Sequence, residues 1–461
     1  MVYTQSSLFI IVFFLVFPLN NQVRATDFPP QQAPAGATNV RDFGATCNGT
    51  GDDTASLQAA AAAIPPGGGT LYVPPGLICK LSGTVLLSSN THVLAYHATF
   101  RPTGSGKAHS VFRNRNNSIR YLTTTDRTTD VAFLHVSSTQ GATVGQEVLA
   151  EGIPLGTTIV SVAASSIKLS VPVSVKNGTL VTLLSDHDIS IEGGTIDYTE
   201  ARAGQGTHAI EMDFVSRVRI LRVVGRGAET DGEGAGDFVA CIGCSDVLEQ
   251  ENDVSGFSNS DFDHWWGTSN VSIINNKIVE MNTNQIINVN SKETGFDSPG
   301  PMSRKFTLTG NDISYKSPKS GAILISPIGK MTSVADVSIS NNNFYNSSVL
   351  IRGNTQNIDV HENNFSNILG GSSAIGCYAD ASGTPKEIKI IGNKINNAAT
   401  AASNLAVIRV EAENATVAKN TVTGGAHYAG IYASSGVALS NNVVAPGIKG
   451  YRITGPARPS R

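Results

Sequence analysis

The carboxyl-terminal half of the chain repeats one short pattern of apolar and polar positions. Each copy reads apolar, any residue, apolar, two residues of any kind, Asn, any residue, apolar. The clearest copies are NVSIINNKI, KFTLTGNDI, DVSISNNNF, NIDVHENNF, EIKIIGNKI, NATVAKNTV and GVALSNNVV. Alternation with a period of two is typical of a β-strand and excludes helical repeats. Units this short cannot bury an apolar face alone, so the pattern predicts strands that stack from one copy to the next.

The recurring asparagine predicts how the copies are aligned. An inward Asn at a turn can bond the backbone and the Asn one coil away, which satisfies polar groups that burial would leave unpaired. Parallel connections are nearly always right-handed. We therefore predict an all-β fold, a single-stranded right-handed parallel β-helix of about ten coils over residues 187–455. Its ladder positions are Gly194, Val223, Asn252, Asn276, Asn311, Asn342, Asn363, Asn393, Asn420 and Asn442.

A different pattern occupies residues 38–120, which we interpret as an amino-terminal cap and the first coils. The segment NVRDFGATCNGTGDDTASLQAAAA is followed by PPGGGTLYVPPG. Asp52 or Asp53 is expected to cap a short Ala-rich helix from Thr54 to Ile64, and LYVPPG reads as a strand that ends at prolines. A helix at this place would shield the strand edges at the open end of the solenoid.

In these motifs the sequence resembles the pectate-lyase-like superfamily of right-handed β-helix proteins, which opens with DFGA, GDDT, an amphipathic helix and GGGTLYVPPG. The resemblance covers about forty residues closely, and the repeated pattern extends it over most of the remaining chain. It implies the fold and a broad class that contains pectin and alginate lyases, polygalacturonase-like hydrolases, uronate epimerases and phage tailspikes. The Asn-Thr-Asp, Asp-Asp and Gly-His-Gly motifs of the polygalacturonase-like members are missing.

The repeat is interrupted at residues 121–186. Alternating stretches such as TTIVSVAASSIKLSV, with turn signals at Gly152-Ile153-Pro154 and Asn177-Gly178, predict a small all-β insertion. Either a carbohydrate-contacting wall or a decorative lid would fit this pattern.

Composition argues against nucleic-acid binding, and the amino-terminal segment predicts secretion. Charged residues make up 15% of the chain and the net charge is −3, so there is no basic excess for nucleic acid or an acidic membrane. The apolar run from Leu8 to Leu19 is too short to span a bilayer and is followed by Val23-Arg24-Ala25. We interpret residues 1–25 as a removed signal peptide. We expect a secreted monomer with no further membrane segment.

The cysteines are too few for a disulfide scaffold. Cys47 could pair with Cys79 outside the cell, as could Cys241 with Cys244. The Cys241-Ile242-Gly243-Cys244 spacing has no second pair or His partner at metal-ligand spacing. We therefore predict a structural role for it and no metal site.

Candidate chemistry is concentrated in three acidic segments, which precede successive strands of the repeat by similar intervals. They are HAIEMD (208–213), GDFVACI (236–242) and DFDHWWG (261–267). We expect these segments to stack side by side, and the loop between two of them adds further acids. The predicted catalytic residues are Asp237, Asp261, Asp263 and His264, and the predicted substrate-binding residues are Glu211, Asp213, Asp231, Trp265 and Trp266.

These residue types suit cleavage of a glycosidic bond. One carboxyl group with a raised pKa can protonate the leaving oxygen while an ionised one activates water, and tryptophan rings stack on sugars. If Phe262 points inward, so does His264, whereas Asp261, Asp263 and Trp265 point outward. The three aspartates Asp237, Asp261 and Asp263 are accordingly stronger candidates than His264.

The leading hypothesis is a polysaccharide hydrolase, with polysaccharide as the only expected partner and no cofactor. A lyase or uronate epimerase is the alternative, in which Ca²⁺ or basic groups would neutralise the uronate. A non-catalytic glycan-binding solenoid is the third hypothesis, and a carboxylate row that is only a solvated face would fit it.

Overall fold

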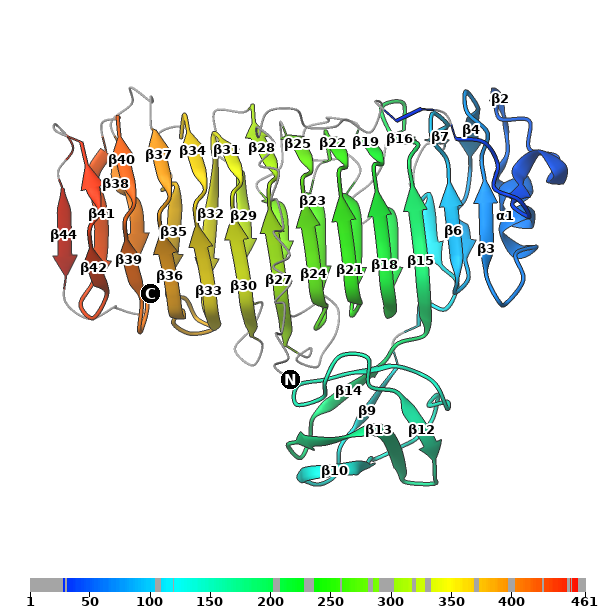
Figure 1. Cartoon of the computed structure of the whole chain (residues 1–461), viewed down its shortest axis with the longest axis horizontal. Helices are drawn as coiled ribbons and strands as arrows, with labels where there is room; N and C mark the ends of the chain where they lie inside the picture. The colour runs from blue at the N-terminus through cyan, green and yellow to red at the C-terminus, as the bar shows by residue number, and fades with distance from the viewer. Residues whose placement is uncertain are drawn as a thin grey trace, which may run out of the picture.

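A computed structural model shows the chain as a right-handed parallel β-helix, which confirms the predicted fold (Figure 1). It describes residues 28–29, 31–103, 109–118, 120–201, 208–227, 236–257, 259–280, 285–289, 302–316, 321–327, 333–368, 373–396, 403–424, 427–445, 448 and 450–454. The predicted signal peptide lies outside these residues. None of the described helices is both long and apolar enough to span a bilayer.

Three long parallel sheets run the length of the solenoid, and each coil after the first contributes one strand to each sheet. The first sheet, called sheet A here, carries the apolar alternation of the repeat. Its strands are β1 (Thr38–Asn39), β3 (Gly69–Tyr72), β6 (Thr91–Leu94), β15 (Asp186–Glu192), β18 (Val215–Leu221), β21 (Ser245–Gln250), β24 (Ser269–Ile274), β27 (Ser303–Thr309), β30 (Val334–Ser340), β33 (Thr355–His361), β36 (Lys386–Ile391), β39 (Thr416–Ala418) and β42 (Ala438–Ser440).

Sheet B follows sheet A in each coil and consists of short strands. They are β2 (Asn48–Asp52), β4 (Ile78–Leu81), β7 (Thr99–Pro102), β16 (Thr195–Asp197), β19 (Val224–Arg226), β22 (Asp253–Ser255), β25 (Lys277–Glu280), β28 (Asp312–Tyr315), β31 (Asn343–Tyr345), β34 (Asn364–Ser366), β37 (Lys394–Asn396), β40 (Thr421–Thr423) and β43 (Val443–Val444).

Sheet C closes each coil, and it contains the three acidic segments singled out in the sequence. Its strands are β5 (Val85–Leu87), β8 (Phe112–Asn114), β17 (His208–Asp213), β20 (Asp237–Ile242), β23 (Ser260–Trp265), β26 (Gln285–Val289), β29 (Gly321–Ile325), β32 (Ser347–Arg352), β35 (Ile375–Tyr378), β38 (Ser403–Val410), β41 (His427–Ser434) and β44 (Tyr451–Thr454).

The asparagine ladder occupies the turn between sheets A and B, as predicted. At a typical rung, Asn342 Oδ1 accepts from the backbone N–H and the Nδ2 of Asn311, while Asn342 Nδ2 donates to Leu308 O and to Asn363 Oδ1. The same bonds continue to Asn442, and at the other end the N–H of Val223 donates to Asn252 Oδ1. Every buried amide group of the ladder is thus satisfied, and the coils are locked in register.

The amino-terminal helix α1 (Thr54–Ala62) lies at the end of the stack beside β2 and β3 (Figure 1), after the short 3₁₀ helix η2 (Val40–Phe43). It buries Leu57, Ala60 and Ala61 against the first coils. Asp53 is the residue before the helix, but its side chain makes no capping hydrogen bond to it. Asp53 is buried and accepts from Thr46 and Cys47, whereas Asp52 Oδ1 accepts from the N–H of Thr54.

The cysteines behave in two ways. Cys47 and Cys79 form the disulfide that the sequence allowed, which joins the first two strands of sheet B. Cys241 and Cys244 are free and buried, so the second possible pairing is not formed.

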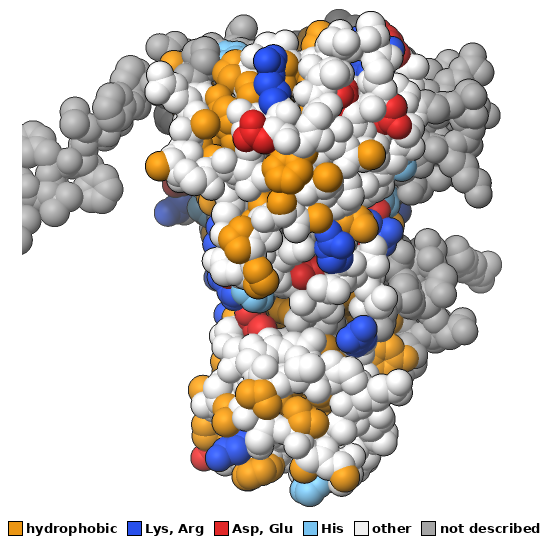
Figure 2. Space-filling view, turned by 90° about the vertical axis from the view of Figure 1, so that its right-hand side faces the viewer, with side chains coloured by type: hydrophobic (Ala, Val, Ile, Leu, Met, Phe, Trp, Pro, Cys, Tyr) orange, Lys and Arg blue, Asp and Glu red, His pale blue; other side chains and the backbone are white. Residues whose placement is uncertain are grey.

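The segment between β8 and β15 forms two small antiparallel sheets with their own core. Their strands are β9 (Tyr121–Thr123), β10 (Thr128–His135), β11 (Val148–Leu149), β12 (Ile159–Val162), β13 (Ser166–Val175) and β14 (Leu180–Leu183). Figure 1 shows this unit as a lobe below the stack of coils, and Figure 2 shows hydrophobic side chains on the surface of the lobe. Exposed ones include Val131, Phe133, Val144, Val160 and Val171.

The insertion is anchored to the solenoid at the corner between sheets C and A. Leu149 and Leu184 pack with Phe214, Ile242 and Trp266. Polar contacts reinforce this corner. Arg217 Nη1 lies 2.9 Å from Glu147 Oε2, and Arg304 Nη2 donates to the carbonyl oxygens of Ala150 and Ile153.

Candidate functional site

Strands β17, β20 and β23 lie side by side in sheet C, so the three acidic segments are neighbours. In this register Glu211 stands opposite Ala240, Ala240 opposite Asp263, and Asp263 opposite Asn288 of β26. We call the polar group formed by these strands and β8 the sheet C cluster. It consists of Arg113, His208, Glu211, Asp213, Asp237, Asp261, Asp263, Trp265 and Asn288.

Asp263 is the most strongly perturbed carboxyl group of the sheet C cluster. Its side chain is only 1% exposed, and burial together with the charge of Asp237 raises its pKa well above the usual range. Asn288 Nδ2 donates to Asp263 Oδ1 over 2.9 Å, and the indole N–H of Trp265 donates to the same oxygen. Asp263 Oδ2 has no hydrogen-bond partner among the described residues. A buried carboxyl group of this kind is suited to hold a proton at neutral pH.

His208 and Asp237 form a buried pair across two neighbouring strands. His208 Nδ1 lies 2.6 Å from Asp237 Oδ2, while Asp237 Oδ1 accepts from Asn259 Nδ2 and from the N–H of Ser260. Burial disfavours the imidazolium, but the hydrogen bond and charge of Asp237 outweigh it and raise the pKa of His208. Sequence reasoning placed His208 in the first acidic segment but gave it no role.

Arg113 is a site residue that the sequence did not reveal. It comes from β8, before the insertion, and its Nη2 lies 2.9 Å from Glu211 Oε1 and 2.5 Å from Asp213 Oδ2. Ser110 Oγ also donates to Glu211 Oε2. Burial and the Glu211 charge raise the pKa of Asp213 to about 6, against the opposing effect of Arg113. An inserted domain separates Arg113 from Glu211 in sequence, so no local motif links them.

The two tryptophans have different surroundings. Trp265 is partly exposed, and its ring is nearly perpendicular to that of His208, with the two ring centroids 6.2 Å apart. Trp266 is 1% exposed and packs against the insertion through Leu149 and Leu184. The prediction that Trp266 stacks on a sugar is therefore corrected: the ring anchors the insertion. Trp265 keeps an exposed surface for such stacking.

His264 lies on the inner side of β23. Its neighbour Phe262 belongs to the solenoid core, so the alternation predicted from the sequence holds, and His264 is fully buried within 3.2 Å of Glu249. A catalytic role for His264 in the sheet C cluster does not fit this position, because the ring lies on the opposite side of the strand from Asp263. Asp261 is also fully buried. Asp231 lies outside the described residues.

The sheet C cluster therefore combines three kinds of group within four neighbouring strands. Asp263 is a carboxyl group with a strongly raised pKa. Glu211 is an acidic side chain held by the guanidinium of Arg113. His208 and Asp237 form a buried pair. Such neighbours with opposed protonation tendencies are what acid–base chemistry on a sugar requires. Arg113, Glu211 and Trp265 reach solvent, whereas Asp237 and Asp263 lie beneath them.

The described residues that could hold a metal lie elsewhere, inside the coil. Cys241, Glu249 and His264 offer potential ligand atoms that lie within 4.8 Å of one another.

No known protein-family profile matches the sequence. No curated protein sequence is similar to it either. Solved structures do share its fold. The Streptococcus pneumoniae surface adhesin PfbA has a TM-score of 0.55 at 18% identity, over 92% of this chain and 93% of that one. The A-module of the Azotobacter vinelandii mannuronan C-5 epimerase AlgE6 has a TM-score of 0.54 at 14% identity, over 92% of this chain and 100% of that one.

The amino-terminal fragment of bacteriophage Phi29 gene product 12 is also similar, with a TM-score of 0.54 at 15% identity over 90% of this chain and 66% of that one. At these identities the likeness concerns the fold. The chain shares the right-handed parallel β-helix fold with these proteins, as the repeated pattern predicted.

Proposed function

We propose that this protein is a secreted enzyme that hydrolyses glycosidic bonds of a polysaccharide at the sheet C cluster. The observation that carries the proposal is Asp263, a buried carboxyl group with a raised pKa, in the same row of sheet C as the acidic side chain of Glu211. A flat sheet face with a partly exposed Trp265 beside this row suits an extended glycan.

In the proposed reaction Asp263 donates its proton to the leaving glycosidic oxygen. Glu211 takes a proton from a water molecule, whose oxygen attacks the anomeric carbon as the carbon–oxygen bond breaks. Both residues occupy the same register position two strands apart, which puts their Cα atoms about 9–10 Å from each other. Carboxyl groups separated by roughly 6.5–9.5 Å leave room for water and invert the anomeric configuration. Ala240 places only a methyl group between them.

Other residues of the sheet C cluster set the protonation of Asp263 and the position of Glu211. Asp237 raises the pKa of Asp263 through its charge and orients His208, so we regard it as a positioning residue. Arg113 holds Glu211 in place through an ion pair between its guanidinium and the Glu211 carboxylate. Because Trp265 donates its indole N–H to Asp263, a sugar that displaces this ring would bring the acid into contact with the substrate.

A lyase or uronate epimerase is the second candidate. Arg113 favours it, because a guanidinium in the sheet C cluster is suited to neutralise a uronate carboxylate. A non-catalytic glycan-binding role is the third. It is supported by the fold shared with PfbA, which is named as a surface adhesin.

We also propose that the protein acts outside the cell. The disulfide between Cys47 and Cys79 supports this, since such bonds persist in oxidising compartments. The apolar amino-terminal run supports it as well.

A panel of neutral and acidic polysaccharides tests the proposal, with three products measured on the same samples. New reducing ends without the ultraviolet absorbance of an unsaturated uronate are expected. Absorbing products would instead identify elimination, and inversion at C5 without chain shortening would identify epimerisation. Binding without turnover on every glycan would refute the enzymatic proposal.

A further inference from the structure

The interior of the solenoid contains a pair of buried ionisable residues, Glu249 and His264. On sheet A, Glu249 occupies a row whose other members are apolar in every coil from Leu71 to Leu439, among them Ile220, Ile273, Leu308 and Ile339. On sheet C, His264 lies between Cys241 and Val289 in a similar row. Polar side chains at inward positions cost stability unless something compensates them. Two such exceptions thus face each other across one part of the core.

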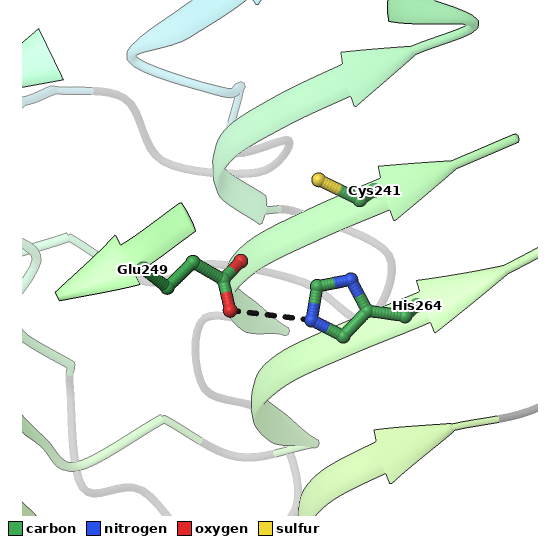
Figure 3. A group of neighbouring side chains, drawn as sticks. All are labelled: Cys241, Glu249 and His264. Atoms are coloured by element: carbon green, nitrogen blue, oxygen red, sulfur yellow. Dashed lines mark hydrogen bonds and ion pairs between the residues drawn. The ribbon is translucent and has the colours of Figure 1, made fainter. Parts of the chain in front are cut away.

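Cys241 completes this group, which we call the interior triad (Figure 3). Cys241 lies on the strand that closes one coil, and Glu249 and His264 both belong to the next coil. All three side chains are fully buried, and their potential ligand atoms lie within 4.8 Å of one another. Figure 3 shows the carboxylate of Glu249 directed at the imidazole of His264, with the thiol of Cys241 beside them. The Nε2 of His264 and the Oε2 of Glu249 are 3.2 Å apart.

The Glu249–His264 contact alone leaves buried polar atoms unsatisfied. Among the described residues, neither Glu249 Oε1 nor His264 Nδ1 has a hydrogen-bond partner. A buried carboxylate with an unpaired oxygen is costly in an apolar interior, because nothing there replaces its hydration. A cation at the triad would lower that cost by neutralising the carboxylate.

We propose that Cys241, Glu249 and His264 bind one borderline-soft divalent transition metal ion of the Zn²⁺ class inside the coil. Thiolate, imidazole and carboxylate are the ligand types that Zn²⁺ takes. Two nitrogen or oxygen ligands at about 2.0–2.1 Å in a tetrahedral site lie about 3.3 Å apart, close to the observed Glu249–His264 separation. Binding releases the thiol proton of Cys241, and a thiolate, a carboxylate and a neutral imidazole then balance the two positive charges.

Cys377 is an inward-facing cysteine that can be compared with Cys241. It occupies the same sheet C row as Cys241 several coils further on, and it is equally buried. Its register partners are Ile351 and Val410, which cannot bind a metal. This cysteine acts as a small apolar residue and serves as a natural internal control.

The interior triad lies directly behind the sheet C cluster. His264 is adjacent to Asp263 on β23, and Cys241 is adjacent to Ala240 on β20. A metal bound there would tie these two strands to β21 from within. This structural role is independent of the proposed hydrolysis and would hold for a purely glycan-binding protein.

The test is metal analysis of the full mature chain, because the buried site must be filled during folding. Protein refolded with Zn²⁺ and then dialysed against metal-free buffer should retain close to one zinc ion per chain. Refolding with Co²⁺ should give the intense visible bands of a tetrahedral site and a thiolate-to-cobalt charge-transfer band. The double variant Glu249→Ile, His264→Val copies the neighbouring coils, so it should fold, retain no zinc and lack both spectral features.

The variant Cys377→Ala should retain zinc like the wild type, whereas Cys241→Ala should lose the charge-transfer band. Zinc retention equal in the wild type and the double variant would overturn the proposal, since the metal would then lie elsewhere. Refolded wild type without stoichiometric zinc would also overturn it, as would a Cys241–Cys244 disulfide in the native protein.

Discussion

The imidazole Nδ1 of His208 lies 2.6 Å from Oδ2 of Asp237, and the two residues occupy the same register position on adjacent strands of sheet C. The pair is buried, so its electrostatic interaction is only weakly screened by solvent. The charge of Asp237 also reaches Asp263 on the next strand. One carboxylate thus sets the protonation of a base on one side and of an acid on the other.

Replacing that carboxylate should change the titration of His208. In Asp237→Asn the pKa of His208 should fall, because burial would then act without the opposing charge and hydrogen bond of Asp237. Histidine ring signals in a pH titration by NMR measure this directly. The variant Asp246→Asn, at an exposed pair with Arg219 on sheet A, is the matched control and should leave His208 unchanged.

The raised pKa of His208 also makes the free energy of unfolding depend on pH. The folded state binds this proton more tightly than the unfolded state, so the contribution is fully present below the unfolded pKa of about 6.5 and is lost as pH rises through the folded value. The stability difference between wild type and His208→Gln should therefore shrink at alkaline pH. A difference that grows with pH would contradict the assignment.

Asp213 should give stability the pH dependence of a buried acid. Its folded pKa of about 6 lies above the ordinary 3.8, so the protonated form is favoured in the folded state. That contribution is present below about pH 4 and is lost as pH rises to about 6, and two pKa units correspond to about 3 kcal/mol. Denaturant unfolding of wild type and Asp213→Asn at several pH values should show wild type losing relative stability over this window. Parallel curves would contradict the prediction.

The asparagine ladder should dominate the stability of the carboxyl-terminal coils. Asn342→Ala removes hydrogen bonds to Asn311, Asn363 and Leu308 and leaves their buried groups unpaired, at a cost of about 2–4 kcal/mol. Thermal unfolding and amide exchange in the neighbouring coils measure this loss. The exposed neighbour Asn343 is the control, and Asn343→Ala should cost much less. Equal losses would mean that the ladder bonds contribute nothing beyond those of a surface residue.

The insertion should be held by a small apolar contact. Leu149→Ala reduces the packing of Leu149 against Trp266 and Phe214, and truncation of a buried Leu costs about 2–5 kcal/mol. Faster proteolysis of the connections to residues 121–186 is expected, with the unfolding of the solenoid itself little changed. The exposed Val144→Ala on the same unit should have no such effect. Unchanged proteolysis in Leu149→Ala would assign the anchoring to the polar contacts of Glu147 and Arg304 instead.

The sequence predicted the coils and their register well, because both depend on short-range patterns. The apolar alternation fixes which side chains point inward, and the recurring Asn fixes where each turn lies. Together they correctly brought Glu211, Asp237 and Asp263 into neighbouring strands. The same alternation predicted the inward direction of His264.

What the sequence could not show were contacts between distant segments. Arg113 reaches Glu211 only because β8 pairs with β17 across the whole insertion. The burial of Trp266 depends on where that insertion docks. The interior triad depends on two sheets facing each other, so the positions of Cys241, Glu249 and His264 along the chain do not reveal that they meet. Contacts of this kind follow from stacking and not from local sequence.

The account rests on Asp263 as the general acid of the sheet C cluster. The most direct measurement is kcat on a polysaccharide cleaved by the wild type, compared among wild type, Asp263→Asn and the control Asp246→Asn, with folding checked by circular dichroism. The account predicts that Asp263→Asn lowers kcat by about 10²-fold or more while the control stays near wild type. A folded Asp263→Asn variant with a kcat equal to that of the wild type would contradict it.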